Sequence, residues 1–181
     1  MLYSHSKGHY KDITIEGCEP SSKNYKHFFK KPLKEEYLKL KLYNQTFQAV
    51  QTDRKFDFLT AIYVFPHFEL DDLAGVVRKS YSMLDKTGVF VLVVADEKYL
   101  KEKLRSKKDL FIEENTIDFG RKKYREVLHY SEIPEIGKVI DYNREEAFYV
   151  DLFKGNKFEL ESKNSLNDNG FICTVFVFKK K

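Results

Sequence analysis

Hydrophobic and polar residues follow one another in blocks that predict strands and helices in turn. Residues 38–43 alternate Leu with Lys, which is the period of a half-buried strand. Nearly continuous apolar runs at 56–64 and 89–95 are typical of strands that are covered on both faces. Between them, residues 70–84 carry an apolar stripe at three- and four-residue spacing, which predicts an amphipathic helix. This order predicts a right-handed parallel crossover.

The two ends of the chain carry further elements. A β-rich stretch at 13–18 stops at Glu19-Pro20-Ser21-Ser22, and the serines can cap a helix that follows. Near the C-terminus, strands are expected at 157–163 and 170–178, and the Asn/Asp/Gly turn between them predicts an antiparallel hairpin.

The middle of the chain, residues 96–142, has a looser pattern. A charged helix is expected at 98–108, followed by short strands at 124–130 and 138–142. Asn143 and Glu146 then match a capping box, which predicts the start of another helix, and Gly155 can end it.

Composition and charge narrow the class of protein. The 181 residues carry a net charge of +4 and contain no repeat or linker, so we expect one domain over 1–181. No apolar run approaches the roughly 20 residues that span a bilayer, so we expect a cytoplasmic protein without a membrane partner.

Cys18 and Cys173 indicate neither a disulfide framework nor a zinc site. His5 and His9 have a metal-compatible spacing but lack a third ligand, so no metal is expected.

Candidate chemistry lies where the predicted parallel strands end, because ligands of open parallel sheets bind there. Glu19 ends the first strand, and its carboxylate offers acceptors for both hydroxyls of a ribose, although it equally supports the helix start. Tyr63 and His67 follow the strand at 56–64 as candidates for catalysis, and His67 can move protons near neutral pH. A lone histidine beside aromatic residues is more often a packed, hydrogen-bonded residue. Asn44 and Gln45 follow the strand at 38–43, where turn chemistry explains an Asn equally well.

Three segments together resemble the class I S-adenosylmethionine-dependent methyltransferases. They are Glu19-Pro20-Ser21 after a strand, Phe56-Asp57-Phe58, and the run from Leu84 to Gly88 before an apolar strand. The resemblance covers nearly the whole chain and implies an α/β fold: a mostly parallel Rossmann-like sheet with a C-terminal antiparallel hairpin. It also implies S-adenosylmethionine as the cofactor. It would place Glu19 at the ribose, Asn44 or Gln45 near the adenine, and Tyr63 in the wall near the methionine arm. Further candidate cofactor contacts are Pro20, Ala61 and Ile62.

The amino terminus departs from that family. Its members begin with a buried strand that ends in a Gly-x-Gly loop, whereas residues 1–9 resemble the end of the first helix. We therefore expect the first strand to be missing and cofactor binding to be weak or absent. We favour the explanation that this sequence starts late relative to a longer natural product. Met1 would then be an internal methionine of that product. The alternatives are that neighbouring strands close up or that another subunit of a homo-oligomer fills the gap.

The resulting hypothesis is a methyltransferase that acts on a small-molecule acceptor and is truncated or inactive as written. Residues 96–142 would form a cap over the substrate, with Tyr124 and Tyr130 as candidate substrate contacts. The alternative is a non-catalytic methyltransferase-like module that binds protein or nucleic acid. In that case the lysine pairs, together with the two tyrosines, would form a basic stacking groove, although solvated surface explains such pairs equally well. The pairs are Lys30-Lys31, Lys107-Lys108 and Lys122-Lys123.

Overall fold

The computed structural model describes residues 13–28, 38–105, 107, 109–133, 137–168 and 170–181. They belong to two compact units, Met1–Thr52 and Asp53–Lys181. Each unit is described by itself below, and the expectation of a single domain over 1–181 stays a prediction. Among the described residues, no helix is long and apolar enough to span a membrane.

The first unit contains a small parallel sheet. Strand β1 (Ile13–Cys18) pairs with β2 (Leu38–Tyr43), with Ile13 opposite Leu38 and Cys18 opposite Tyr43. Helix α1 (Ser22–Phe28) follows β1, and the 3₁₀ helix η1 (Phe47–Ala49) follows β2. The Ser21 hydroxyl accepts a hydrogen bond from the Asn24 N–H at 3.3 Å, so the predicted serine cap is confirmed.

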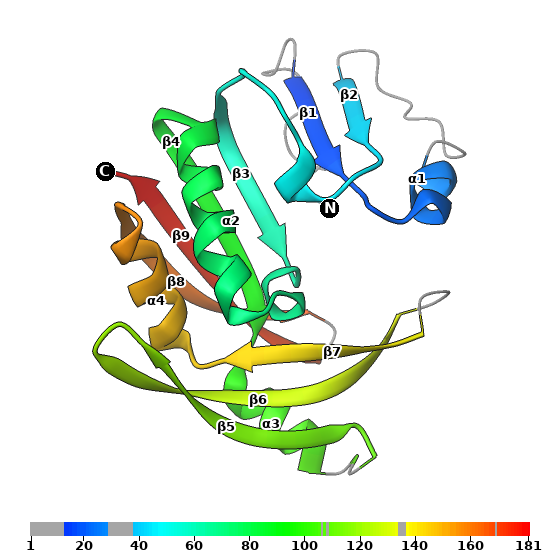
Figure 1. Cartoon of the computed structure of the whole chain (residues 1–181), viewed down its shortest axis with the longest axis vertical. Helices are drawn as coiled ribbons and strands as arrows, with labels where there is room; N and C mark the ends of the chain where they lie inside the picture. The colour runs from blue at the N-terminus through cyan, green and yellow to red at the C-terminus, as the bar shows by residue number, and fades with distance from the viewer. Residues whose placement is uncertain (1–12, 29–37, 106, 108, 134–136, 169) are drawn as a thin grey trace. The chain divides into compact units, whose positions relative to one another are not determined.

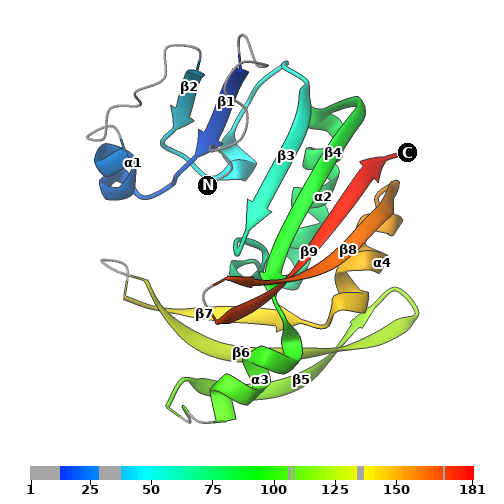
Figure 2. The same cartoon turned by 180° about the vertical axis from the view of Figure 1, so that it is seen from behind.

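The second unit is built on a four-stranded mixed sheet in the order β3-β4-β9-β8 (Figures 1 and 2). Strands β3 (Phe56–Ile62) and β4 (Leu84–Ala95) are parallel, and η2 (Phe65–His67) and helix α2 (Leu70–Met83) connect them, which confirms the predicted crossover. Strands β8 (Phe158–Asp168) and β9 (Phe171–Lys180) form the predicted hairpin.

The expectation of a mostly parallel sheet is wrong for this unit. Strand β9 is antiparallel to both β4 and β8, so β3 with β4 is the one parallel pair of the mixed sheet. A tight turn joins β8 to β9, and such a connection requires antiparallel strands. The sequence pattern gives the hairpin but not its insertion beside β4.

Helices α2 and α4 (Glu146–Gly155) lie on the same face of the mixed sheet, as both views show (Figures 1 and 2). Alternate residues of β4 and β9 point into this layer, where Leu92 and Phe176 are fully buried. The ring of Phe153 in α4 stacks on that of Phe178, with 4.0 Å between centroids. This aromatic layer is the core of the second unit.

The opposite face of the mixed sheet is more open. Phe58 and Ile62 of β3 are 52% and 55% exposed, while Val91 and Val93 of β4 are half-buried. The prediction that both of these strands are covered on both faces is therefore wrong, because α2 and α4 lie on the other side.

Between β4 and α4 the chain forms helix α3 (Glu97–Arg105) and a separate antiparallel sheet, called here the insert sheet. Its strands are β5 (Phe111–Phe119), β6 (Lys122–Ile133) and β7 (Gly137–Arg144), in the order β5-β6-β7. Leu100 and Leu104 of α3 pack on Val127 of β6. The sequence pattern indicated α3 and parts of β6 and β7 but not β5.

One local prediction is also corrected. Asn143 is no helix cap, because β7 continues to Arg144 and buries the Asn143 side chain; Glu145 is the N-cap of α4. Gly155 does end that helix, as predicted. The turn before β9 contains Gly170 at φ 84°, and its N–H donates to the Asn167 side chain at 2.8 Å.

Candidate active site

The candidate site begins where β3 ends. Tyr63 has φ 56°, a left-handed conformation that is uncommon for a residue with a side chain, and its N–H donates to the Val93 carbonyl at 2.9 Å. Its ring packs edge-on against Phe171, with 5.4 Å between centroids. This bend takes the chain out of the sheet and into η2, which carries His67.

His67 is paired with a buried carboxylate. Its Nδ1 lies 2.6 Å from Oδ1 of Asp141 in β7, and the His67 side chain keeps 40% of its surface exposed. The Ser131 hydroxyl of β6 donates to the other oxygen of Asp141 at 2.5 Å. The carboxylate therefore accepts a hydrogen bond at Oδ2 and makes a close charged contact at Oδ1, and the His67 imidazole in that contact remains accessible.

A second histidine lies behind the first. His129 is buried in β6, and its Nε2 is 3.7 Å from Oδ2 of Asp141. The Asn143 amide nitrogen lies 2.9 Å from His129 Nδ1, the geometry of a donor facing a neutral ring nitrogen. His67, His129, Ser131, Asp141 and Asn143 are called the His67 cluster below.

The two histidines differ in charge preference. The hydrogen bond to Asp141 raises the pKa of His67 above 6.5, against the effect of burial. Burial lowers the pKa of His129 below 6.5. Burial alone would raise the pKa of Asp141, but hydrogen bonds from His67 and Ser131 bring it below its ordinary value. The cluster thus holds an ionised carboxylate, a neutral inner histidine and an outer histidine that takes up a proton readily.

This arrangement suits proton transfer at the outer ring. When His67 is neutral and its Nδ1–H faces Asp141, the lone pair lies on Nε2. A carboxylate in that position fixes the tautomer and stabilises the imidazolium that forms when Nε2 accepts a proton. The geometry is therefore that of a general base.

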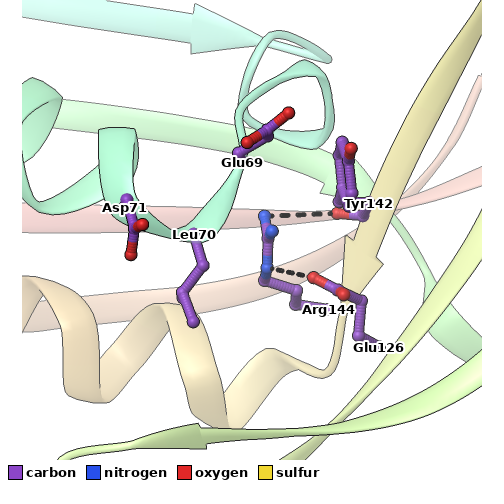
Figure 3. A pocket seen from close by; sticks show the side chains of 6 residues that line it. All are labelled: Glu69, Leu70, Asp71, Glu126, Tyr142 and Arg144. Atoms are coloured by element: carbon purple, nitrogen blue, oxygen red, sulfur yellow. Dashed lines mark hydrogen bonds and ion pairs between the residues drawn. The ribbon is translucent and has the colours of Figure 1, made fainter.

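A pocket of about 290 Å³ lies between the start of α2 and the insert sheet (Figure 3). Its lining comes from the start of α2 and from two insert-sheet strands, namely Glu69, Leu70, Asp71, Glu126, Tyr142 and Arg144. Residues alternate in direction along a strand, so Tyr142 and Arg144 lie on the face of β7 opposite Asp141. Within the pocket, Arg144 Nε is 2.7 Å from Glu126 Oε2, and both side chains are buried.

In the first unit the structure brings Glu19, Pro20 and Asn44 together. The Ser21 N–H donates to Glu19 Oε1 at 2.8 Å. The Asn44 amide donates to the carbonyls of Glu19 and Pro20, at 2.9 and 3.4 Å, and its oxygen accepts from the Ser22 hydroxyl. Asn44 thus joins the ends of β1 and β2, and Gln45 follows it, half-buried.

The two tyrosines suggested as substrate contacts lie apart along β6. Tyr124 is buried, its hydroxyl donates to Asp151 at 2.6 Å, and its ring packs on Phe148, so packing accounts for its position. Burial also raises the pKa of Tyr124 to about 12. Tyr130 is half-buried with Lys138 Nζ 5.4 Å from its ring centroid, and six residues along a strand separate it from Tyr124 by about 20 Å.

The remaining predicted residues have varied positions. Ala61 is half-buried and Ile62 is exposed, both at the end of β3. His5 and His9 lie outside the described residues. Across the described part of the chain, no group of three or more His, Cys, Asp or Glu side chains is placed to hold a metal.

Sequence reasoning found His67 but missed its partners. Asp141, His129 and Ser131 lie more than sixty positions downstream, in strands that were only partly predicted. A signal did exist, because His129 with Ser131 and Asp141 with Asn143 are polar pairs at two-residue spacing. On a strand such pairs share a face.

No protein-family model matches the chain, and no curated protein matches it. Solved structures do match it. The chain is similar to a putative S-adenosylmethionine-dependent methyltransferase from Listeria monocytogenes, with a TM-score of 0.64, 13% identity, and coverage of 93% of this chain and 80% of that one. It is also similar to an S-adenosylmethionine-dependent methyltransferase from Clostridium acetobutylicum ATCC 824, with a TM-score of 0.58, 14% identity, and 93% and 75% coverage.

A third similar structure is the glycopeptide N-methyltransferase MtfA complexed with S-adenosyl-L-methionine. Its TM-score is 0.64 at 11% identity, and the match covers 97% of this chain and 90% of that one. Identities this low establish the architecture alone. The chain therefore has the fold of the class I S-adenosylmethionine-dependent methyltransferases.

Proposed function

We propose that this chain is an S-adenosylmethionine-dependent methyltransferase domain in which His67 is the general base for a small-molecule acceptor. The observation that carries the proposal is the 2.6 Å pair of His67 and Asp141, in a chain with this fold. The partners of His67 come from the insert between β4 and α4, which supports a substrate-side role for residues 96–142.

The residues fit the cofactor in part. Glu19 follows β1, and a carboxylate there suits the vicinal hydroxyls of a ribose. Asn44 is engaged with backbone carbonyls and a serine hydroxyl, so we assign it to the turn rather than to the adenine. Pro20, Gln45, Ala61, Ile62 and Tyr63 remain proposed neighbours of the cofactor. The sequence has no Gly-x-Gly, so we propose that residues 1–181 bind the cofactor weakly.

The chemistry assigned to this chain is proton removal. The bound cofactor would supply a methyl group on a positively charged sulfur. As an acceptor nitrogen or oxygen takes that methyl group, its proton passes to Nε2 of His67, and Asp141 stabilises the imidazolium. No other group of the cluster needs to change its protonation.

The test is methyl transfer at millimolar S-adenosylmethionine, with a panel of small amines and phenols and with release of S-adenosylhomocysteine as the readout. We expect H67Q to lower kcat about 100-fold. The neutral form of His67 is the base, so the rate should rise with pH through the pKa of His67, above 6.5. D141N should move that rise toward 6.5 and lower kcat.

The matched control is D118N, which removes an exposed carboxylate that lies 3.8 Å from Lys123 in the same sheet. It should leave the profile unchanged. Transfer that is as fast in H67Q as in the wild type would contradict the assignment of the base.

Calorimetry separates the proposal from its alternative. Micromolar affinity of residues 1–181 for S-adenosylmethionine would overturn the proposed weak binding. Absence of both binding and transfer at millimolar cofactor would instead favour the non-catalytic module, because the sequence lacks the glycine loop. A nucleic-acid role for that module predicts a steep loss of affinity with salt.

A further inference from the structure

Strand β7 holds the segment around His67 at two points. Asp141 contacts the His67 ring, and Nη1 of Arg144 donates to the carbonyl of Phe68, the next residue along, at 3.1 Å. Positions 141 and 144 lie on opposite faces of the strand. Both can reach the same segment because β7 is the edge strand of the insert sheet and packs against η2.

Arg144 is built into this place. It is 3% exposed, and its Nε meets Glu126 Oε2 at 2.7 Å (Figure 3). Its guanidinium also lies 5.4 Å from the ring centroids of Tyr142 and Phe148. A planar, permanently charged fork can satisfy a carboxylate at one edge and a carbonyl at another, which a lysine cannot do.

We propose that Arg144 is a positioning residue for His67: by holding the Phe68 carbonyl, it fixes the place from which the imidazole meets Asp141. Glu126 neutralises Arg144 and orients its guanidinium. The effect of Arg144 on catalysis rests on the proposed function. Its effect on the geometry of the His67–Asp141 pair does not.

Strand β7 fixes the distance between the two residues that hold this segment. Asp141 and Arg144 are three residues apart on one strand, so their spacing is fixed by the backbone. A displacement of the Phe68 carbonyl by about 1 Å would shift His67 relative to Asp141 and disturb their 2.6 Å contact. Displacements of that size at a catalytic group cost up to about 100-fold in rate.

The test is the double variant E126L/R144M, followed by NMR titration of the His67 ring, with H67Q to assign its signal. The double variant removes no net charge, so a change in titration reports position. The titratable groups that act on His67 are Asp141 and His129, and both remain. We expect the pKa of His67 to fall toward 6.5 and, in the transfer assay, kcat to fall about tenfold with KM unchanged.

R144M alone would leave Glu126 buried without its partner, so it is not the chosen variant. If E126L/R144M does not fold, R144K gives the same test, since a lysine that pairs with Glu126 cannot also hold the Phe68 carbonyl. The matched control is E97Q/R125Q, which removes a 2.8 Å ion pair elsewhere in the insert. It should leave the His67 titration unchanged.

A folded E126L/R144M or R144K protein whose His67 titrates as in the wild type would overturn the proposal. A shifted titration in a protein that transfers no methyl group would uphold the positioning role and count against the proposed function instead. The two ideas therefore fail separately.

Discussion

At the residue scale, one carboxylate serves two histidines whose pKa values move in opposite directions. His67 is partly exposed and gains a partner, so its pKa rises. His129 is buried and loses solvation, so its pKa falls. The stability contributed by His67 is complete below pH 6.5 and is lost as the pH rises through its folded value. The His129 contribution is present above 6.5 and is lost as the pH falls toward its lower folded value.

We predict that H129Q makes the protein less sensitive to acid. His129 takes up a proton near pH 6.5 in the unfolded chain but only at lower pH in the folded chain. Acidification therefore destabilises the wild type through His129, and the variant lacks this loss. The measurement is the urea unfolding free energy at about pH 7.5 and about pH 5.5. H129Q also removes a like charge that disfavours protonation of His67, so any change in the His67 contribution acts in the same direction as the prediction. Equal losses in the two proteins would contradict the prediction.

The same residues show what the sequence can predict of the site. Tyr63 and His67 follow a strongly apolar strand, so their place at a strand end was visible. Asp141 and His129 lie on a polar antiparallel sheet, and nothing local indicates that this sheet turns those residues toward η2. Their pairing depends on tertiary packing, which a single sequence does not encode in its local pattern.

At the element scale, two glycines in regular elements have opposite roles. Gly75 is an exposed position within α2, and an added Cβ would meet nothing within 4 Å. Gly88 lies buried inside β4. A Cβ there would be 3.0 Å from the Phe56 carbonyl and 2.9 Å from Leu84 Cδ2. Gly88 allows β4 to pass close to the start of β3.

We predict that G75A stabilises the protein by about 0.5–1 kcal/mol, because alanine loses less backbone entropy in a helix. By contrast, G88A should destabilise it by about 1–3 kcal/mol through overpacking against the Phe56 carbonyl. Urea unfolding of the two variants under the same conditions measures both effects, and each variant serves as the control for the other. A neutral G88A would show that β3 and β4 separate at little cost.

The sequence pattern predicts a helix or strand well where one face of that element is strongly buried. The stripe of α2 and the apolar run of β4 both reflect direct contact with the core. Strand β5 was missed because Phe111–Phe119 alternates exposed and half-buried positions, and its polar residues leave no apolar run. Sheets that are mostly solvated give weak periodic signals.

At the scale of the whole molecule, the buried residues are unevenly divided between the two units. Among the described residues, Val50 is the one buried hydrophobic side chain of the first unit. The aromatic core around Phe153 and Phe178 belongs entirely to Asp53–Lys181. A core of that kind, in a segment of ordinary domain size, is sufficient for independent folding.

We predict that residues 53–181 expressed alone unfold cooperatively and keep the raised pKa of His67, because every residue of the His67 cluster lies within that segment. Residues 1–52 alone should show no cooperative transition. Circular dichroism during urea unfolding, with NMR titration of the histidine, measures both. A non-cooperative 53–181 fragment would mean that its core depends on the preceding residues.

The fold was predictable from the order of weak motifs rather than from any one of them. Glu19, Phe56-Asp57-Phe58 and the Leu84–Gly88 run are each common, but their sequence along the chain matches one architecture. The mixed character of the sheet was less visible, because the position of β9 beside β4 is set by packing and leaves no local pattern.

Pairing between β6 and β7 places His129 opposite Asp141 and Glu126 opposite Arg144. A replacement on this ribbon alters one group and leaves the others where they are. Inserting a single amino acid within β7 just before Asp141 would instead turn every later side chain of the strand to the opposite face. The Asp141 carboxylate and the Arg144 guanidinium would then exchange faces. The ribbon therefore tolerates changes of residue identity far better than changes of length.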